Sequence, residues 1–524
     1  MSVRTYLMKH AGSTTSRPGT SRRVNTSAVL AVVCVALGAV AAAMASLNVA
    51  LPDLARSTGA TQTQLEWIID AYSLVFAALL LPAGALGDRY GRRRALLAGL
   101  VIFGGASAAA MTATSANELI GLRGVIGLGA ALVMPATLST ITGTFPPAQR
   151  TRAVSVWAAV AGGAALLGLL CTGTLLQWFS WRSAFAVNVV LAAAAIAGTV
   201  LFVPESADRD APRLDTAGAL LTMAGLTTLV FSIIEAPEAG WGSARTLGGV
   251  GGGLVILAAF AGWEHRAAHP MLDVRQFRSR RLSAGSLSIF IQFFAFFGFT
   301  FVCLQYLQGV RGDSPLVAAL SVLPLAATMM PTARITPRLA ARFGARAVCV
   351  TGLVLVAAGL AVISRVGVTS PYWLLVAGLI PLGAGMGAAM TPATAAITEG
   401  LPAAQQGVGS ALNDLSREVG GALGIAVIGS VVTAVYRASL DLAGVPAALA
   451  SKARGSFALA IHAGGPVKAT ASGAFVDGIH TGLLYAAGAA VLAAITVTVL
   501  LAGDPPAGHR AELGRGHPAV WCSH

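Results

Sequence analysis

The sequence predicts an all-α integral membrane protein that crosses the bilayer about 14 times as helices. Of its 524 residues, 56% are hydrophobic and only 11% are charged, which leaves too few polar residues to cover a soluble protein. The apolar runs are unbroken and about 20 residues long, and this length favours helices over the alternating strands of a barrel. Helices also satisfy their own backbone hydrogen bonds inside lipid, where water cannot do so.

The predicted spans follow one another with mostly short connections. Their limits are 28–51, 65–86, 95–113, 119–143, 153–176, 183–203, 216–234, 246–263, 283–305, 314–332, 347–364, 372–397, 408–436 and 479–501. The first 27 residues are rich in Ser, Thr and Arg, and we interpret them as a retained cytoplasmic tail because a full-length span follows them. The longest outside connection, 437–478, is polar, rich in Gly and Ala, and carries no motif.

Basic residues predict how these spans are oriented. The net charge is +14, and the predicted connections on the side of the N-terminus hold about 24 Lys and Arg residues, against about 9 on the other side. Because Lys and Arg gather in cytoplasmic loops, we expect both termini in the cytoplasm and an even number of crossings. This distribution explains the basic charge without a nucleic-acid partner, and we predict none.

A weak internal repeat predicts how the spans are grouped. After the second span, Tyr90-Gly91 is followed by Arg92, and after the tenth span, Phe343-Gly344 is followed by Arg346. Internal repeats of this kind are typical of secondary transporters. The predicted division is a tail (1–27), a six-helix bundle (28–203), two linker spans with a cytoplasmic loop (204–282), a second six-helix bundle (283–502) and a tail (503–524).

The loop after the second span combines residues with separate physical roles. Gly84 lets helices approach closely, Asp88 places a carboxylate at the cytoplasmic end of the span, and Gly91 permits a tight turn. Arg89 and Arg92 can pair with carboxylates or helix C-termini of the other half. We expect such contacts to latch an inner gate; the alternative is that these arginines only orient the span.

Three charged residues stand near the outer ends of spans two and four. Glu66 and Asp70 are four residues apart and share a helix face, and neighbouring carboxylates in a low dielectric favour keeping a proton. Arg123 enters from the same side at a similar depth, so that it can pair with Asp70. Charges inside spans are functional candidates by default. Two interpretations stay open: Asp70 exchanges protons while Arg123 tunes it, or the two form a static ion pair.

Later spans carry further candidates. Gly168 and Gly173 in span five are either part of an antiporter motif or small residues for helix packing. In span thirteen, Asp414 and Arg417 are three residues apart and can neutralise each other, while Glu418 adds one unbalanced acid. A self-paired helix anchor is the favoured interpretation of this trio.

A tentative substrate cavity combines polar and aromatic residues. Asn48 and Tyr72 are its candidates in the first half, and Phe293 and Phe297 are its candidates in span nine. Aromatic side chains can line a pocket for a flat organic molecule. For span nine, however, aromatics that face lipid are the favoured interpretation, because the phenylalanines cover all sides of the helix.

Several of these motifs resemble the major facilitator superfamily. The segment from Gly84 to Arg94 resembles its loop signature, and the run around Arg123 is similar to its span-four motif. Gly168-Leu-Leu-Cys-Thr-Gly173 partly matches the antiporter motif of its exporters, and Asn48-Val-Ala-Leu-Pro52 matches the end of a signature of its 14-span drug:proton antiporters. Ala43 stands where those antiporters usually place an Asp.

The resemblance implies two six-helix bundles that face a central cavity, with two additional spans between them. It also implies alternating access and export of a small hydrophobic drug, antibiotic or natural product by proton antiport. The implied partners are a small-molecule substrate, protons and the lipid of the cell membrane, and the implied state is a monomer. A facilitator or importer of a small metabolite on the same fold is the alternative. The spans show no metal-ligand cluster, phosphate loop or nucleophile motif, so we predict no enzyme activity, metal or cofactor.

Overall fold

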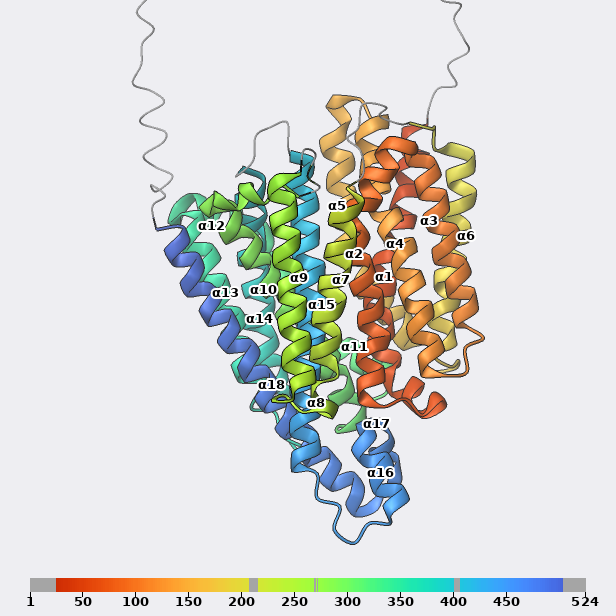
Figure 1. Ribbon diagram of the computed structural model, residues 1–524, viewed down its shortest axis with the longest axis vertical. Helices are drawn as coiled ribbons and strands as arrows, with labels where there is room; N and C mark the ends of the chain where they lie inside the picture. The colour runs from red at the N-terminus through yellow and green to blue at the C-terminus, as the bar shows by residue number, and fades with distance from the viewer. Residues whose placement is uncertain (1–24, 207–214, 268–269, 271, 400–405, 503–524) are drawn as a thin grey trace, which may run out of the picture.

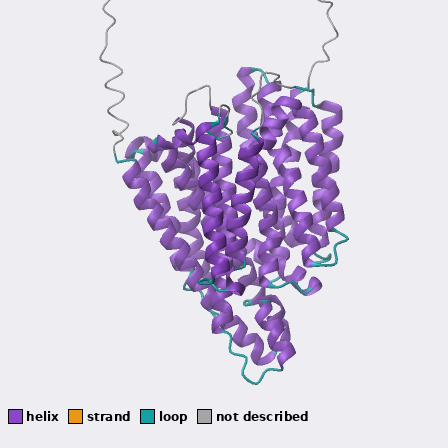
Figure 2. Ribbon diagram, in the orientation of Figure 1, coloured by secondary structure: helices purple, strands orange, loops and turns teal. Residues whose placement is uncertain are grey.

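The protein is an all-helical bundle in a computed structural model that describes residues 25–206, 215–267, 270, 272–399 and 406–502. Within these ranges the chain forms helices and their connections and no strand (Figure 2). Fourteen of the described helices are long and apolar enough to cross a membrane, which confirms the predicted number of spans.

The helices begin and end as follows. The first half holds α1 (Thr26–Thr58), α2 (Gln62–Tyr90), α3 (Arg92–Ala110), α4 (Ala116–Thr144), α5 (Pro147–Leu175) and α6 (Arg182–Phe202). Between the halves lie α7 (Thr216–Ile234), α8 (Ala236–Ala239), α9 (Ala244–Arg266) and the 3-10 helix η2 (Val274–Arg278). The second half holds α10 (Arg280–Gly309), α11 (Pro315–Ser321), α12 (Leu323–Phe343), α13 (Ala345–Ile363), α14 (Tyr372–Glu399), α15 (Gln406–Ser439), α16 (Ala447–Gly455), α17 (Phe457–Ala460), η4 (Ile461–Ala463) and α18 (Gly465–Leu500).

Each half packs its six spans in the same pattern. In the first half α1 packs on α5 and α6, α4 packs on α2 and α3, and α3 packs on α6. In the second half α10 packs on α15 and α18, α14 packs on α12 and α13, and α13 packs on α18. The two halves are therefore equivalent six-helix bundles, as predicted. The additional spans α7 and α9 pack on each other, and α7 lies against α2 and α15.

The predicted repeat has the same backbone geometry in both bundles. Gly91 ends α2 and precedes α3 with φ 121° and ψ 123°, and Gly344 ends α12 and precedes α13 with φ 86° and ψ 144°. A positive φ is disfavoured for residues with a Cβ atom, so glycine permits this abrupt reversal between adjacent spans.

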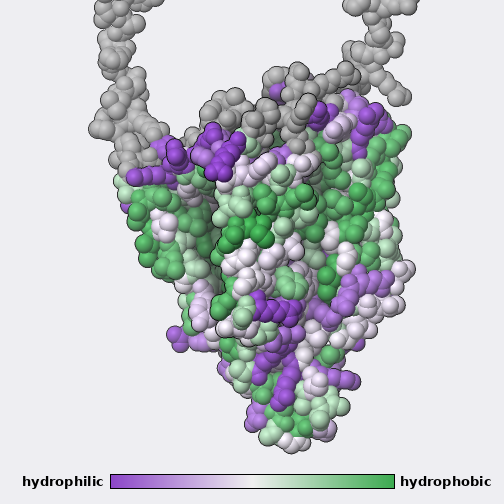
Figure 3. All heavy atoms as spheres, in the orientation of Figure 1, coloured by the Kyte–Doolittle hydropathy of each residue, from purple (hydrophilic) through white to green (hydrophobic). Residues whose placement is uncertain are grey.

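The two ends of the bundle differ. The start of α1 and the end of α18 lie on one side, the terminus side, which is at the top of Figure 1, and α16 and α17 lie on the opposite side, the cap side. On the face drawn in Figure 3, a mostly apolar band separates hydrophilic residues at the upper rim from those lower down. This arrangement fits a protein surrounded by lipid at its middle.

The segment 437–478 differs from the expectation of a plain connection. α15 continues to Ser439, α18 begins at Gly465, and the short helices α16, α17 and η4 lie between them. Phe457 and Phe475 stack with their ring centroids 3.9 Å apart, and Tyr436 donates a hydrogen bond to the carbonyl oxygen of Ala453 at 2.7 Å. Burial of these aromatic rings gives the hairpin a core of its own.

Candidate functional site

A cavity of about 410 Å³ lies in the terminus-side half of the molecule. Residues of both bundles line it: α2, α3, α4 and α5 contribute from the first and α15 from the second. Its polar side chains include Asp88, Arg92 and Asp414, and its apolar wall includes Trp157. A volume of several hundred Å³ with a mainly apolar wall and a few polar groups is typical of small-molecule sites.

The cavity wall follows two helix faces that the sequence analysis did not combine. Leu80, Gly84 and Asp88 recur every four residues on α2, and Pro135, Ser139 and Thr142 form a similar stripe on α4. A search for residues at helical spacing from Asp88 would have found the first stripe. The stripe on α4 carries only uncharged polar side chains, Ser139 and Thr142, which do not distinguish it from other spans. The sequence therefore did not predict it.

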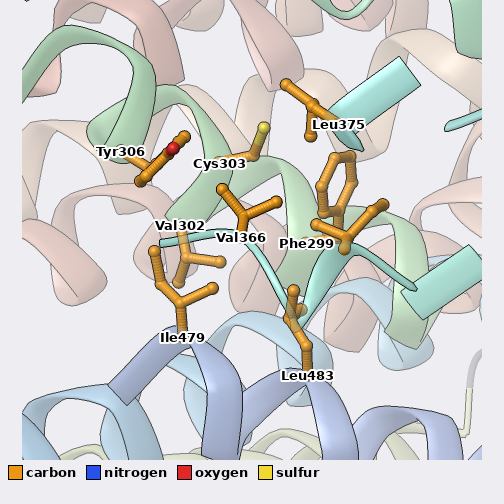
Figure 4. A pocket seen from close by; sticks show the side chains of 9 residues that line it. Phe299, Val302, Cys303, Tyr306, Val366, Leu375, Ile479 and Leu483 are labelled. Carbon is orange, nitrogen blue, oxygen red and sulfur yellow. The ribbon is translucent and has the colours of Figure 1, made fainter. Parts of the chain in front are cut away.

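A second, much smaller pocket lies inside the second bundle (Figure 4). Phe299 and Tyr306 of α10, Leu375 of α14 and Leu483 of α18 surround a space of about 10 Å³. Such a space accommodates at most about one water molecule. It is a packing gap between helices and is too small for an organic ligand.

The bundles are in contact on the cap side. Gln308 of α10 donates a hydrogen bond to the carbonyl oxygen of Val49 in α1 at 2.9 Å. Gly173 of α5 faces α11 so closely that a Cβ atom there would stand 3.0 Å from the carbonyl oxygen of Pro315. The α2–α15 contact forms a second seam between the bundles, related to the α5–α11 seam by the repeat. The cavity is thus bounded by closed seams towards the cap side.

The loop between α2 and α3 is held within its own bundle. Arg92 donates to Asp88 at 2.8 Å, and a Cβ atom at Gly143 of α4 would overlap the Arg92 guanidinium. Behind the loop, Glu205 accepts from the backbone amide of Arg93 at 3.2 Å. Arg89 lies over the ring of Tyr90. Within the described residues, neither Arg89 nor Arg92 forms an ion pair with the second bundle.

Arg123 is almost fully buried in the first bundle. Its Nε donates to the carbonyl oxygen of Ile68 at 2.8 Å, and its guanidinium lies 4.4 Å from the centre of the Tyr72 ring. The structure shows no Arg123–Asp70 ion pair among the described residues, so the predicted pairing is corrected. Arg123 and Asp70 were expected at similar depths in their helices, but the arginine side chain is directed to the Ile68 carbonyl oxygen and the Tyr72 ring instead.

The two acids of α2 face different neighbours. Asp70 is fully buried, and neither of its carboxylate oxygens has a protein hydrogen-bond partner. Glu66 accepts from Thr433 of α15 at 2.9 Å, and its other carboxylate oxygen lies 3.4 Å from the Ser430 hydroxyl. Glu66 therefore joins the two bundles directly, whereas Asp70 is a buried carboxyl group without a hydrogen bond to the protein.

The three charges of span thirteen form one cluster: the spacing predicted the Asp414–Arg417 pair, but Glu418, expected to be unbalanced, also contacts Arg417. Arg417 lies 3.7 Å from Asp414 and 3.4 Å from Glu418, and it covers the ring of Phe293 at 5.5 Å. Glu418 is fully buried and one of its carboxylate oxygens has no partner. Asp414 also lines the cavity of about 410 Å³, so the cluster reaches the space between the bundles.

None of the four tentative cavity residues lines the large cavity. Asn48 donates to the carbonyl oxygen of Ala45 in its own helix, and Tyr72 donates to that of Val40 in α1. Phe297 is 8% exposed and packs against Gly421 of α15, where a Cβ atom would stand 2.8 Å from its ring. The favoured view that the span-nine aromatics face lipid is therefore wrong for Phe297, because glycines in α15 open room for it between the helices.

Gly168 and Gly173 both lie at tight helix contacts. A Cβ atom at Gly168 would stand 2.7 Å from the Cα atom of Ala42 in α1, within the first bundle. Gly173 instead faces the second bundle at the α5–α11 seam. The two glycines thus lie at different contacts, Gly168 inside the first bundle and Gly173 at the seam between the bundles.

The fold and site define a polytopic membrane transporter with two equivalent bundles around a cavity. The sequence model of the Major Facilitator Superfamily matches residues 33–425. The chain belongs to this superfamily, which confirms the predicted family.

Its relatives include named efflux proteins. The multidrug resistance protein Stp of Mycobacterium tuberculosis is 35% identical over 396 residues, which are 75% of this chain and 74% of that protein. The multidrug efflux pump LfrA of Mycolicibacterium smegmatis is 35% identical over 457 residues, which are 87% of this chain and 89% of that protein.

The fold also has solved counterparts. A crystal structure of a bacterial homologue of the human lysosomal transporter Spinster aligns with a TM-score of 0.64 and 17% identity, covering 90% of this chain and 96% of that one. At this identity the likeness concerns the fold alone.

Proposed function

We propose that the protein exports small hydrophobic drugs, antibiotics or natural products across the cell membrane by alternating access. The observation that carries this proposal is the cavity of about 410 Å³, which both bundles line on the terminus side while their seams are in contact on the cap side. With the arginine-rich terminus side in the cytoplasm, a cytoplasmic substrate enters this cavity and leaves on the cap side. The named drug efflux relatives support this direction of transport.

Asp70 is the proposed proton carrier. It is a fully buried acid with no protein partner in the outer half of α2, and Ala43 removes the acid that similar antiporters place in span one. An intramembrane carboxyl group without a hydrogen bond or ion pair among the described residues is a proton-relay candidate. Glu66, which is bound to the second bundle, and Arg123, which is bound to a carbonyl oxygen, position the helices around it.

The loop between α2 and α3 is the proposed inner gate. Arg92 and Asp414 line the same cavity from opposite bundles, while Arg92 is now bonded to Asp88. When the bundles approach each other on the terminus side, Arg92 can leave its ion pair with Asp88 and form one with Asp414 of the second bundle. With Arg92 bonded to Asp88 in its own bundle, the proposed gate is in its open form.

Efflux in cells tests the proposal. We expect expression in a drug-sensitive host to raise resistance to several hydrophobic compounds, and a protonophore to abolish efflux. Asp70→Asn should remove the proton dependence, whereas Asp477→Asn, the same change at an exposed position, should not. Proton-driven efflux at the wild-type rate in Asp70→Asn would refute the role of Asp70. Uptake of a metabolite without resistance to any compound would favour the alternative, an importer or facilitator.

We further propose that the protein works as a monomer and does transport rather than catalysis. Both seams that bound the cavity are formed within one chain. The apparent mass in native mass spectrometry, combined with transport by the same preparation, tests the monomeric state.

A further inference from the structure

The additional spans cover only one of the two seams between the bundles. α7 packs against both α2 and α15, whereas the equivalent α5–α11 seam has no third helix of this kind in the described structure. Leu74 of α2, Val230 of α7 and Ala426 of α15 belong to one buried apolar cluster. α7 is therefore wedged where the first bundle meets the second.

At the cap end of α7, one carboxylate connects both bundles. Glu238 of α8 accepts from Thr63 of α2 at 3.1 Å and from Arg437 of α15 at 2.9 Å, through the same Oε1 atom. Hydrogen bonds between charged groups are about twice as strong as neutral ones. Glu235, at the end of α7, accepts from the indole N–H of Trp67 in α2 at 3.3 Å.

Beneath this corner the two bundles are also joined directly. Glu66 of α2 accepts from Thr433 of α15, and Ser430 of α15 donates to the carbonyl oxygen of Ile233 in α7 at 2.8 Å. Gly429 makes room for this contact, because a Cβ atom there would stand 2.8 Å from the carboxyl carbon of Glu66. α2, α7 and α15 thus share one network of polar contacts on the cap side.

We propose that the α7–α8 corner is a clamp that holds α2 to α15 on the cap side while the cavity is open on the terminus side. The clamp presupposes the alternating movement proposed above. If α2 and α15 separate, the Glu238 carboxylate can stay with Thr63 or with Arg437 but not with both. The additional spans are therefore a moving part of the gate rather than a passive spacer.

Distances across the cap side test the clamp. Spin labels at Thr114→Cys, in the exposed turn before α4, and Thr369→Cys, in the exposed turn before α14, report the separation of the bundles. The full-length protein, with its five native cysteines replaced by serine, is measured in lipid nanodiscs by double electron–electron resonance. We expect Glu238→Gln and Arg437→Gln each to raise the ratio of long to short distances about fivefold or more.

Two further variants make the test specific. Arg56→Gln breaks an ion pair of the same 2.9 Å length on the cap side, but within α1 alone, and should leave the distances unchanged. The exchange Glu238→Arg with Arg437→Glu should restore the short distance. The clamp would be overturned if the cap-side label distances in Glu238→Gln and Arg437→Gln equalled those in Arg56→Gln.

The same preparations separate this result from the proposed function. If the variants lengthen the cap-side distance but no drug is exported, the clamp stands and the export proposal fails. If drugs are exported and the variants leave the distances unchanged, export stands and the clamp fails.

Discussion

A side chain added at Gly173 should push the protein open on the cap side. A Cβ atom there would stand 3.0 Å from the carbonyl oxygen of Pro315 and 3.2 Å from the Cβ atom of Ala319, both in the other bundle. Gly173→Val adds two more carbon atoms at this already tight contact. Overpacking of this kind costs about 1–3 kcal/mol.

The expected shift between open and closed molecules depends on which state the overpacking at Gly173 destabilises. Pro315 and Ala319 belong to the second bundle, so separation of the bundles relieves the overlap and only the closed seam is destabilised. A difference of about 1–3 kcal/mol changes the ratio of open to closed molecules by about 5- to 150-fold. The labels at Thr114→Cys and Thr369→Cys measure this ratio directly.

Two other glycines of the same helix are matched controls. Gly168→Val meets the backbone of Ala42 within the first bundle, so we expect lower thermal stability without a change in the distance ratio. A Cβ atom at Gly163 would meet no atom of another segment within 4 Å, so Gly163→Val should change neither property. The reasoning is refuted if Gly173→Val gives the same distances as Gly163→Val, or if Gly168→Val opens the cap side equally.

Three further predictions concern single contacts. Arg123→Gln removes a charged donor to Ile68 worth about 1.5–3 kcal/mol and should lower both melting temperature and efflux. Arg123→Lys should not rescue efflux, because the guanidinium both donates to Ile68 and lies 4.4 Å from the centre of the Tyr72 ring, and a Lys ammonium lacks its planar fork of donors. Gly91→Ala should lower the melting temperature, because Gly91 has a φ of 121° and a Cβ atom there would overlap Glu205. Gly105→Ala should leave the melting temperature unchanged, because a Cβ atom at Gly105 would meet no atom of another segment within 4 Å. Arg437, which donates to Glu238, lowers the pKa of that carboxyl, so the bridge is intact above the ordinary glutamate range and is lost as the pH falls below it. Acidification below that range should lengthen the cap-side distance in the wild type more than in Glu238→Gln; equal responses would contradict this assignment.

Much of the fold was predictable because it depends on local properties of the chain. Hydropathy over about 20 residues determines whether a segment can span lipid, and it predicted 14 spans. The aromatic–glycine repeat after spans two and ten predicted the equivalence of the bundles. The break at Val322 between α11 and α12 and the helices of the 437–478 hairpin were not predicted, because they depend on packing between distant residues such as Phe457 and Phe475.

The candidate site was less predictable, because the position of a residue along its helix follows from the sequence but the direction in which its side chain points does not. A rise of about 1.5 Å per residue placed Asp70 and Arg123 at similar depths, but it did not show which way each side chain turns. Arg123 is directed to the carbonyl oxygen of Ile68, and Glu66 to Thr433 in a helix more than 350 positions away in the chain. The i, i+3 pair of Asp414 and Arg417 was predicted properly, because both residues lie on one helix.

The hairpin of α16 and α17 gives the molecule a folded landmark beyond the band of lipid. Exporters whose mass lies almost wholly in the bilayer offer few epitopes to antibodies and few features for aligning particle images. Here the aromatic core of Phe457 and Phe475 holds a compact surface on the cap side, and α17 contacts α1 of the other bundle. A nanobody against this surface would serve as a fiducial for electron microscopy, and one that straddles the contact with α1 would also trap a single conformation.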